Sequence, residues 1–150
     1  MSEPGTSFWA GQGVNDETLT AAVNSPVAEA VIEIRRIFSD HEVLAWPDGQ
    51  GGAHVVISSV LLGPGWLEET SWVGFMISYA YPDADCYPHY VRPDLNRAAG
   101  LPLEVPFHPG NVFVGQPATM VSRASTRRIP GLDTAGRKAS SVISFIQEQS

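Results

Sequence analysis

The sequence predicts a single α+β domain in which helices near the two ends of the chain cover an antiparallel sheet. Three observations support this prediction. The length of 150 residues is that of one domain. Apolar residues recur at helical spacing near both ends. Between them, apolar runs of strand length alternate with clusters of Gly, Pro and Asp, which is typical of strands joined by short loops.

The first segment, residues 1–24, is rich in Gly, Ser, Thr and Asn, and we expect an extended arm anchored by Phe8 and Trp9. Ser25 and Pro26 then supply an N-cap hydroxyl and a proline at the first helical position. Apolar residues follow at helical spacing, namely Val27, Ala30, Val31, Ile34, Ile37 and Phe38. The arm should therefore lead into a helix that opens the folded domain, residues 25–150.

Four strands are expected next, because β-branched residues and period two replace helical spacing after Asp40. The strand-like runs are EVLAW (42–46), HVVISSVLL (54–62), SWVGFMISY (71–79) and YPHYV (87–91). Short turn-forming segments separate them, so we predict a four-stranded antiparallel meander. The fourth strand is expected at an edge of the sheet, since its proline cannot donate to the hydrogen-bond ladder.

Residues 94–126 show no persistent periodicity, and four prolines interrupt them: Pro102, Pro106, Pro109 and Pro117. So long an irregular segment in a compact domain is usually functional, and we expect a long loop of the active-site type. Regular structure returns after Pro130, where Asp133 or Thr134 can cap a C-terminal helix. The apolar face of that helix is formed by Ala139, Val142, Ile143 and Ile146.

The charge of the chain argues against a nucleic-acid partner. The formal net charge is -7, whereas phosphate binding needs clustered basic residues. Five of the nine basic residues nevertheless lie between Arg123 and Lys138, with only Asp133 opposing them. This local cationic patch would suit an acidic protein surface or a carboxylate; the alternative is a solvated face of a helix and loop.

The sequence indicates no disulfide, secretory signal, membrane helix, metal site or common catalytic motif. A single cysteine cannot form an internal disulfide, so a cytoplasmic setting is expected. The N-terminal residues do not read as a secretory signal, and the longest apolar stretch is far shorter than the roughly 20 residues of a membrane helix. The four histidines lack metal-ligand spacing, and no phosphate loop, nucleophile elbow or zinc motif occurs. We predict no metal and no cofactor.

Two stretches resemble the ubiquitin-conjugating-enzyme fold. LLGPGWLEETSWVGFMISYAYPDADCYPHYV, residues 61–91, is similar to the family's stretch from the second strand to the Tyr-Pro and second proline before the fourth. FHPGN, residues 107–111, resembles the family's His-Pro-Asn turn with one residue inserted. The order of helix, meander, irregular loop and closing helix is also similar. The resemblance runs from about Val27 to the C-terminus.

A closer likeness is to the prokaryotic branch of this family, which is encoded beside activating enzymes and ubiquitin-like modifiers. Gly115, the pair Ser122-Arg123 and the PGLDT segment at 130–134 are similar to that branch's pattern. Ala124 stands where a His often follows the Ser-Arg pair. The resemblance implies a component of a bacterial ubiquitin-like conjugation pathway that accepts or positions the modifier's C-terminus after activation. Its partners would be an activating-enzyme-like protein and the modifier.

The cysteine expected from the resemblance is missing. In the family's thiol enzymes it follows the Asn by about eight residues, where the amide stabilises the developing oxyanion. Counting from Asn111 reaches Thr119, and counting from Gly115 by Gly-x-x-Cys reaches Ala118. Neither is a thiol, so the nucleophile is either another residue or absent.

Three alternatives remain open at this point. Ser122 could carry the acyl group as an oxyester, with Arg123 polarising the carbonyl and Asp133 or His108 taking the proton. Cys86 could act instead, although the two neighbouring aspartates would raise its pKa. The chain could also be a non-catalytic adaptor in which Asn111 merely supports the loop.

The first helix and the loops beside it meet the activating enzyme in the family that the sequence resembles. Arg35 and Arg36 lie outside the apolar stripe of the predicted helix and should therefore be exposed. We accordingly expect both arginines to contact that partner.

Overall fold

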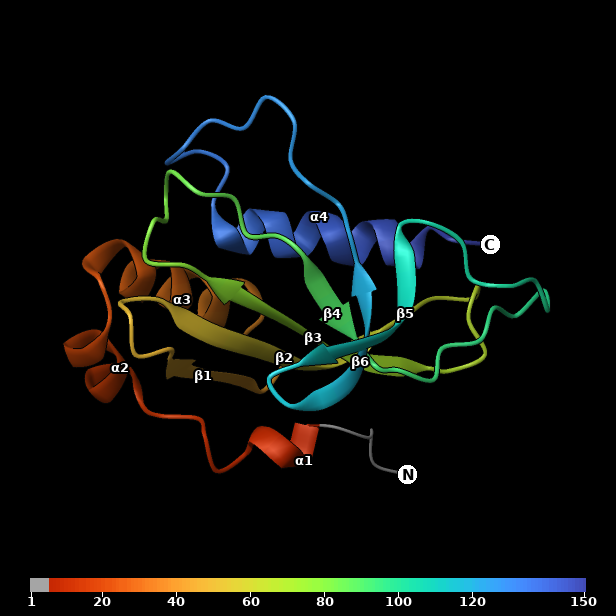
Figure 1. Cartoon of the computed structure of the whole chain (residues 1–150), viewed down its shortest axis with the longest axis horizontal. Helices are drawn as coiled ribbons and strands as arrows, with labels where there is room; N and C mark the ends of the chain where they lie inside the picture. The colour runs from red at the N-terminus through yellow and green to blue at the C-terminus, as the bar shows by residue number, and fades with distance from the viewer. Residues whose placement is uncertain (1–5) are drawn as a thin grey trace.

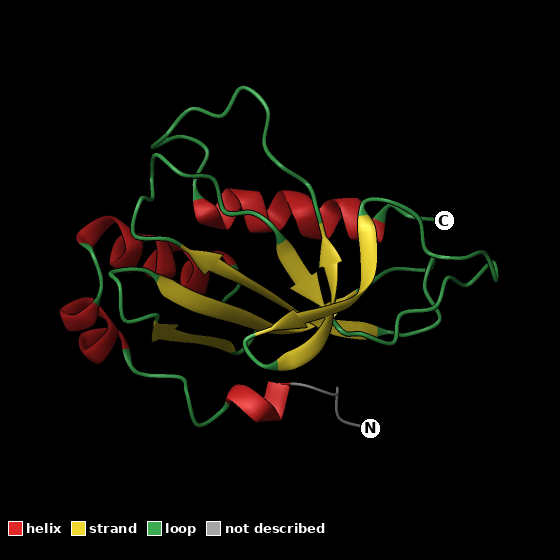
Figure 2. Cartoon of the chain, in the orientation of Figure 1, coloured by secondary structure: helices red, strands yellow, loops and turns green. Residues whose placement is uncertain are grey.

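The computed structural model describes residues 6–150, an α+β fold with a six-stranded antiparallel sheet (Figures 1 and 2). Its helices are α1 (Thr6–Trp9), α2 (Asp16–Ala22), α3 (Ser25–Ile37) and α4 (Ala135–Gln147). Its strands are β1 (Val43–Pro47), β2 (Ala53–Leu61), β3 (Thr70–Ile77), β4 (His89–Val91), β5 (Phe107–Phe113) and β6 (Gln116–Val121). Within these residues, none of the helices has the length and apolar character needed to cross a bilayer.

The helix predicted from Ser25 is confirmed as α3, although Asn24 occupies the N-cap position. Its stripe packs as expected at Val27, Val31 and Ile34, whose side chains are fully buried, whereas Ile37 is exposed. The C-terminal helix is confirmed as α4. Its cap is a threonine, because the Thr134 side chain accepts a hydrogen bond from the Arg137 amide.

The extended arm predicted for residues 1–24 is wrong for two stretches, which form α1 and α2; residues 1–5 lie outside the described part of the chain. The Asn15 side chain caps α2 by accepting from the Thr18 amide at 2.8 Å, and Leu19 is buried in the core. Capping and burial therefore outweigh the weak helix propensity of this composition. Trp9 is an anchor as predicted, at 2% exposure, whereas Phe8 is 59% exposed.

The meander of the first four strands is confirmed, but it forms only part of a sheet ordered β1-β2-β3-β4-β6-β5. The fourth strand, β4, is not at an edge, because it pairs with both β3 and β6. Its proline does not interfere, since Pro88 precedes the first strand residue, His89.

A β-hairpin occupies most of the second half of the predicted loop, so the prediction of one irregular segment over 94–126 is wrong for β5 and β6. Val114 and Gly115 form its two-residue turn, with φ of 43° and 79°, between the paired residues Phe113 and Gln116. The strand register shifts between His108 and Asn111, a bulge that accommodates Pro109. This bulge contains the His-Pro turn of the sequence.

Apolar residues pack on both faces of the sheet. The larger cluster includes the buried faces of α3 and α4, and Figure 1 shows α4 and α1 on opposite sides of the sheet. The smaller cluster is aromatic and contains Trp9, Trp46, Val56, Trp72, Phe113 and Ala118. Gly74 leaves room for the Phe113 ring, since a Cβ there would lie 2.6 Å from it. The N-terminal segment therefore completes the second face through Trp9.

Candidate functional site

Ser122 and His108 are brought together by the β5–β6 pairing. His108 is paired with Met120, so Ser122, two positions further along, is its diagonal neighbour on the same face. The amide of Ser122 continues the pairing by donating to the Pro106 carbonyl at 2.9 Å. His108 Nε2 lies 2.8 Å from Ser122 Oγ, and both residues are partly exposed. The Ser122 hydroxyl also lies 3.5 Å from the Pro106 carbonyl. The distance to His108 is one at which an imidazole can take a proton from a hydroxyl.

His108 and Asp133, the two candidate proton acceptors for Ser122, differ in their contacts. In the tautomer that carries its proton on Nδ1, His108 can accept the Ser122 proton at Nε2. No described residue is hydrogen-bonded to His108 Nδ1, so the pair has no third member here. Asp133 is not hydrogen-bonded to Ser122, because its carboxylate accepts a hydrogen bond from the Ile129 amide instead.

Asn111 holds the His-Pro turn closed. Its side-chain amide donates to the His108 carbonyl at 3.0 Å, across the bulge in β5. Gly110 makes the turn possible with φ of 78°, a conformation that glycine adopts without strain. Asn111 therefore positions the backbone that carries His108, and this part of its role is structural.

Arg123 lies on an aromatic platform immediately after Ser122. Its guanidinium carbon is 4.1 Å from the centre of the Phe145 ring, and that ring stacks on Phe107 at 5.8 Å. The platform joins α4 to β5, because Phe145 belongs to the helix and Phe107 to the strand. A cation held over a ring is stabilised without a carboxylate partner.

The structure places Cys86 in the core, where it is 2% exposed. Burial, together with the negative charge of Asp85, raises the pKa of the Cys86 thiol to about 12. The reactive form of cysteine is the thiolate, which is scarce at neutral pH for such a group. Cys86 therefore has the surroundings of a core residue.

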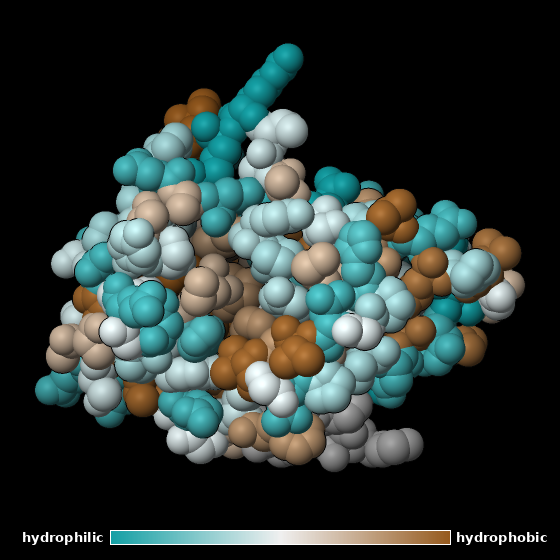
Figure 3. Space-filling model, in the orientation of Figure 1, coloured by the Kyte–Doolittle hydropathy of each residue, from teal (hydrophilic) through white to brown (hydrophobic). Residues whose placement is uncertain are grey.

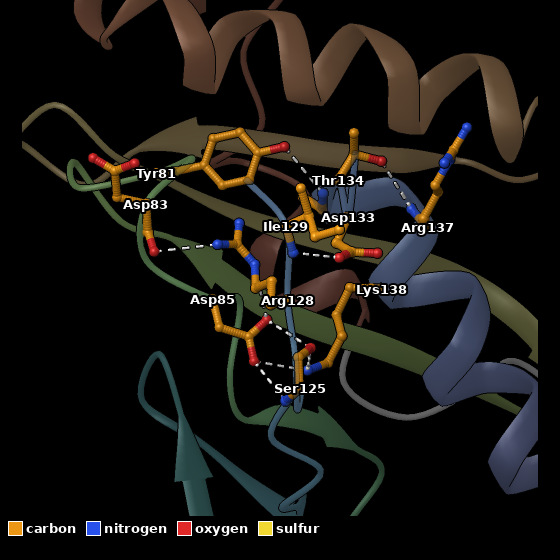
Figure 4. Close-up of polar contacts among 11 residues, drawn as sticks. Tyr81, Asp83, Asp85, Ser125, Arg128, Ile129, Asp133, Thr134, Arg137 and Lys138 are labelled. Atoms are coloured by element: carbon orange, nitrogen blue, oxygen red, sulfur yellow. Dashed lines mark hydrogen bonds and ion pairs between the residues drawn. The ribbon is translucent and has the colours of Figure 1, made fainter. Parts of the chain in front are cut away.

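A polar cluster that the sequence did not reveal ties the segment after β6 to the rest of the fold (Figure 4). Asp85 accepts from the Ser125 amide at 2.8 Å and from Lys138 Nζ at 2.9 Å, and the Arg128 Nε lies 3.7 Å away. Burial alone would raise the pKa of Asp85, but the bonds from Lys138 and Ser125 outweigh it and lower the pKa. The sequence signal for this cluster is the charge of Asp85, which is opposite to that of the cationic patch.

The cationic patch predicted from the sequence lines a pocket of about 320 Å³ between the segment after β6 and α4. All five basic residues contribute to it, and the acidic residue Asp133 lines it as well. Figure 3 shows mostly hydrophilic residues over this upper part of the molecule. The pocket lining begins at Arg123, the residue that follows Ser122 in the sequence.

The two arginines expected to meet a partner differ in exposure. Arg36 is exposed, whereas Arg35 is partly buried and forms an ion pair with Asp16 at 2.9 Å. Arg35 also donates to the Val43 carbonyl and so joins α3 to α2 and β1. The expectation that both arginines are exposed is therefore wrong for Arg35.

Comparison with known proteins adds no relative. No family model matches the chain, and no curated protein and no solved structure matches it either. Over residues 6–150, no three His, Cys, Asp or Glu side chains form a group that could hold a metal ion.

Proposed function

We propose that this protein is a ubiquitin-conjugating-enzyme-like component of a bacterial ubiquitin-like conjugation pathway, in which Ser122 accepts the activated C-terminus of the modifier as an oxyester. The observation that carries the proposal is the 2.8 Å contact between His108 Nε2 and Ser122 Oγ. It unites two motifs of the resemblance, the His-Pro turn and the Ser-Arg pair, in one site. A serine hydroxyl is a weak nucleophile without such a base.

The proposed step is an acyl transfer from the activated modifier. Ser122 Oγ attacks the carbonyl carbon of the modifier's C-terminal adenylate or thioester, and a new O–C bond forms as the bond to AMP or to the activating enzyme's sulfur breaks. His108 Nε2 takes the hydroxyl proton, which is then passed to the leaving group or to solvent. Arg123, which follows Ser122 in the sequence, is the proposed source of positive charge for the developing oxyanion.

The second candidate is a non-catalytic adaptor that binds the same partners without forming a bond. Two observations favour it: His108 Nδ1 has no hydrogen-bond partner among the described residues, and the Asn111 amide is bonded to the backbone at His108. A base without an orienting group is a less effective catalyst. The two candidates differ in one measurable property, the covalent adduct.

The test is adduct formation with a cognate activating enzyme, its modifier and ATP. The wild type should form an adduct that resists reductant and is cleaved by hydroxylamine or alkali. Ser122→Ala should abolish it, while Ser122→Cys should give an adduct that reductant can cleave. Ser144→Ala, an exposed serine on α4, is the matched control and should leave adduct formation unchanged.

His108→Gln should slow adduct formation by about a hundredfold, the usual contribution of a general base, while the fold measured by circular dichroism stays intact. Full adduct formation by Ser122→Ala would refute the assignment of the nucleophile. Binding of the modifier with no adduct in any variant would leave only the adaptor.

A further inference from the structure

The pocket between α4 and the segment after β6 carries more positive charge than the protein itself neutralises. Its lining includes Arg123, Arg127, Arg128, Arg137 and Lys138, opposed in the lining only by Asp133. The whole chain is acidic, with 16 Asp and Glu against nine Lys and Arg. More than half of all positive charge on an acidic protein is therefore concentrated around one pocket, where it can attract an anion.

Two of the five cations have an internal carboxylate partner. Lys138 and Arg128 both face Asp85, at 2.9 Å and 3.7 Å (Figure 4). Because this carboxylate is shared, the pair retains positive charge. Arg128 also donates to the Asp83 carbonyl at 3.1 Å, which holds its side chain in place.

The other three cations have no carboxylate partner among the described residues. Arg123 lies over the Phe145 ring, and Arg137 donates to the Leu132 carbonyl at 3.1 Å. Arg127 is exposed and makes no polar side-chain contact with the part of the chain that the structure describes. These guanidinium groups leave donors available for a ligand, because each carries five N–H donors.

The spread of the cations around the pocket favours several separate carboxylates over one compact anion. Arg127 lies on the loop after β6 and Arg137 on α4, so the guanidinium groups come from different elements. Each guanidinium can hold one carboxylate through two parallel hydrogen bonds. An extended acidic segment offers such carboxylates along its length.

We infer that this pocket binds an acidic peptide segment, with at least two carboxylates, of the protein whose end reaches Ser122. The inference deepens the proposed function and rests on it only in assigning the segment to that protein. Binding in the pocket does not itself require acyl transfer. The segment would orient the incoming chain, since the pocket lining begins at Arg123, the residue next to Ser122 in the sequence.

The test is fluorescence anisotropy with a labelled peptide of alternating Glu and Gly, compared with the same peptide carrying Gln for Glu. The Glu peptide should bind, more weakly as salt is raised, and the Gln peptide should not. Arg127→Glu and Arg137→Glu should each weaken binding by about tenfold or more, since a like charge replaces an attractive one. Arg36→Glu makes the same change in net charge on α3 and should alter affinity by less than about twofold.

The inference would be overturned by equal binding of the Glu and Gln peptides or by an equal loss of affinity with Arg36→Glu. Displacement of the Glu peptide by inorganic phosphate at lower concentration than by unlabelled peptide would overturn it as well. Absence of any binding would also overturn it. The Ser122→Ala protein keeps the two proposals separate. It should bind the peptide as the wild type does. Absence of an oxyester in the wild type therefore counts against acyl transfer to Ser122, and absence of peptide binding counts against the pocket.

Discussion

At the scale of single residues, the same kind of side chain plays opposite parts according to its surroundings. His108 is partly exposed and contacts the Ser122 hydroxyl, as a proton acceptor must. His89 is fully buried against the Phe75 ring, and neither of its ring nitrogens has a hydrogen-bond partner in the described structure. Burial is the main reason that the pKa of His89 falls to about 3, so this imidazole is neutral in the fold.

His89 should make stability depend on pH. The unfolded chain binds a proton at His89 below a pH of about 6.5, whereas the folded chain does so only near 3. The stability that comes from keeping His89 neutral is therefore fully present above a pH of about 6.5. It is lost as the pH falls from there towards about 3, by about 1.4 kcal/mol of unfolding free energy per pH unit. Urea unfolding at several pH values should show this extra loss in the wild type relative to His89→Leu. If the unfolding free energies of the wild type and His89→Leu changed in parallel with pH, His89 would not be the cause of the loss.

At the scale of secondary-structure elements, the β5–β6 hairpin matters most, because it joins the two halves of the site. Its turn contains an unfavourable residue, since Val114 is β-branched and has φ of 43°. A two-residue turn of this type prefers Asn followed by Gly, and Gly115 already supplies the second residue. The hairpin therefore forms in spite of its first turn residue.

Val114→Asn should stabilise the fold by about 1 kcal/mol, because asparagine tolerates the left-handed conformation that strains valine. The measurement is the urea midpoint at unchanged m-value. Val112→Asn is the control, since Val112 is also exposed but lies in the extended strand, where asparagine is unfavourable. A gain from both substitutions would point to a general solubility effect and against relief of strain.

At the scale of the whole molecule, the N-terminal segment closes the aromatic face of the sheet. The Trp9 ring packs edge-on against Trp72 at 4.8 Å and against Phe113 at 5.7 Å. Its indole N–H donates to the Val114 carbonyl at 3.3 Å. Trp9 therefore connects the start of the chain to the turn of the β5–β6 hairpin.

Trp9→Ala should destabilise the protein by about 3–5 kcal/mol, because it removes a buried ring and leaves a cavity between Trp72 and Phe113. Phe8→Ala removes a neighbouring ring that is 59% exposed and should cost less than about 0.5 kcal/mol. Thermal and urea unfolding of the two variants provide the comparison. Equal effects would show that α1 is not held by Trp9.

The sequence by itself determined the α+β class, α3, α4, the first four strands and the cationic patch, because caps, turns and periodicity act between near neighbours. Tertiary structure alone decided that β4 is internal and that Ser122 meets His108 instead of Asp133. It also decided the contact of Asp85 with Lys138, 53 positions away. Such contacts depend on which strands pair and in what register, and these choices follow from burial of the complete core.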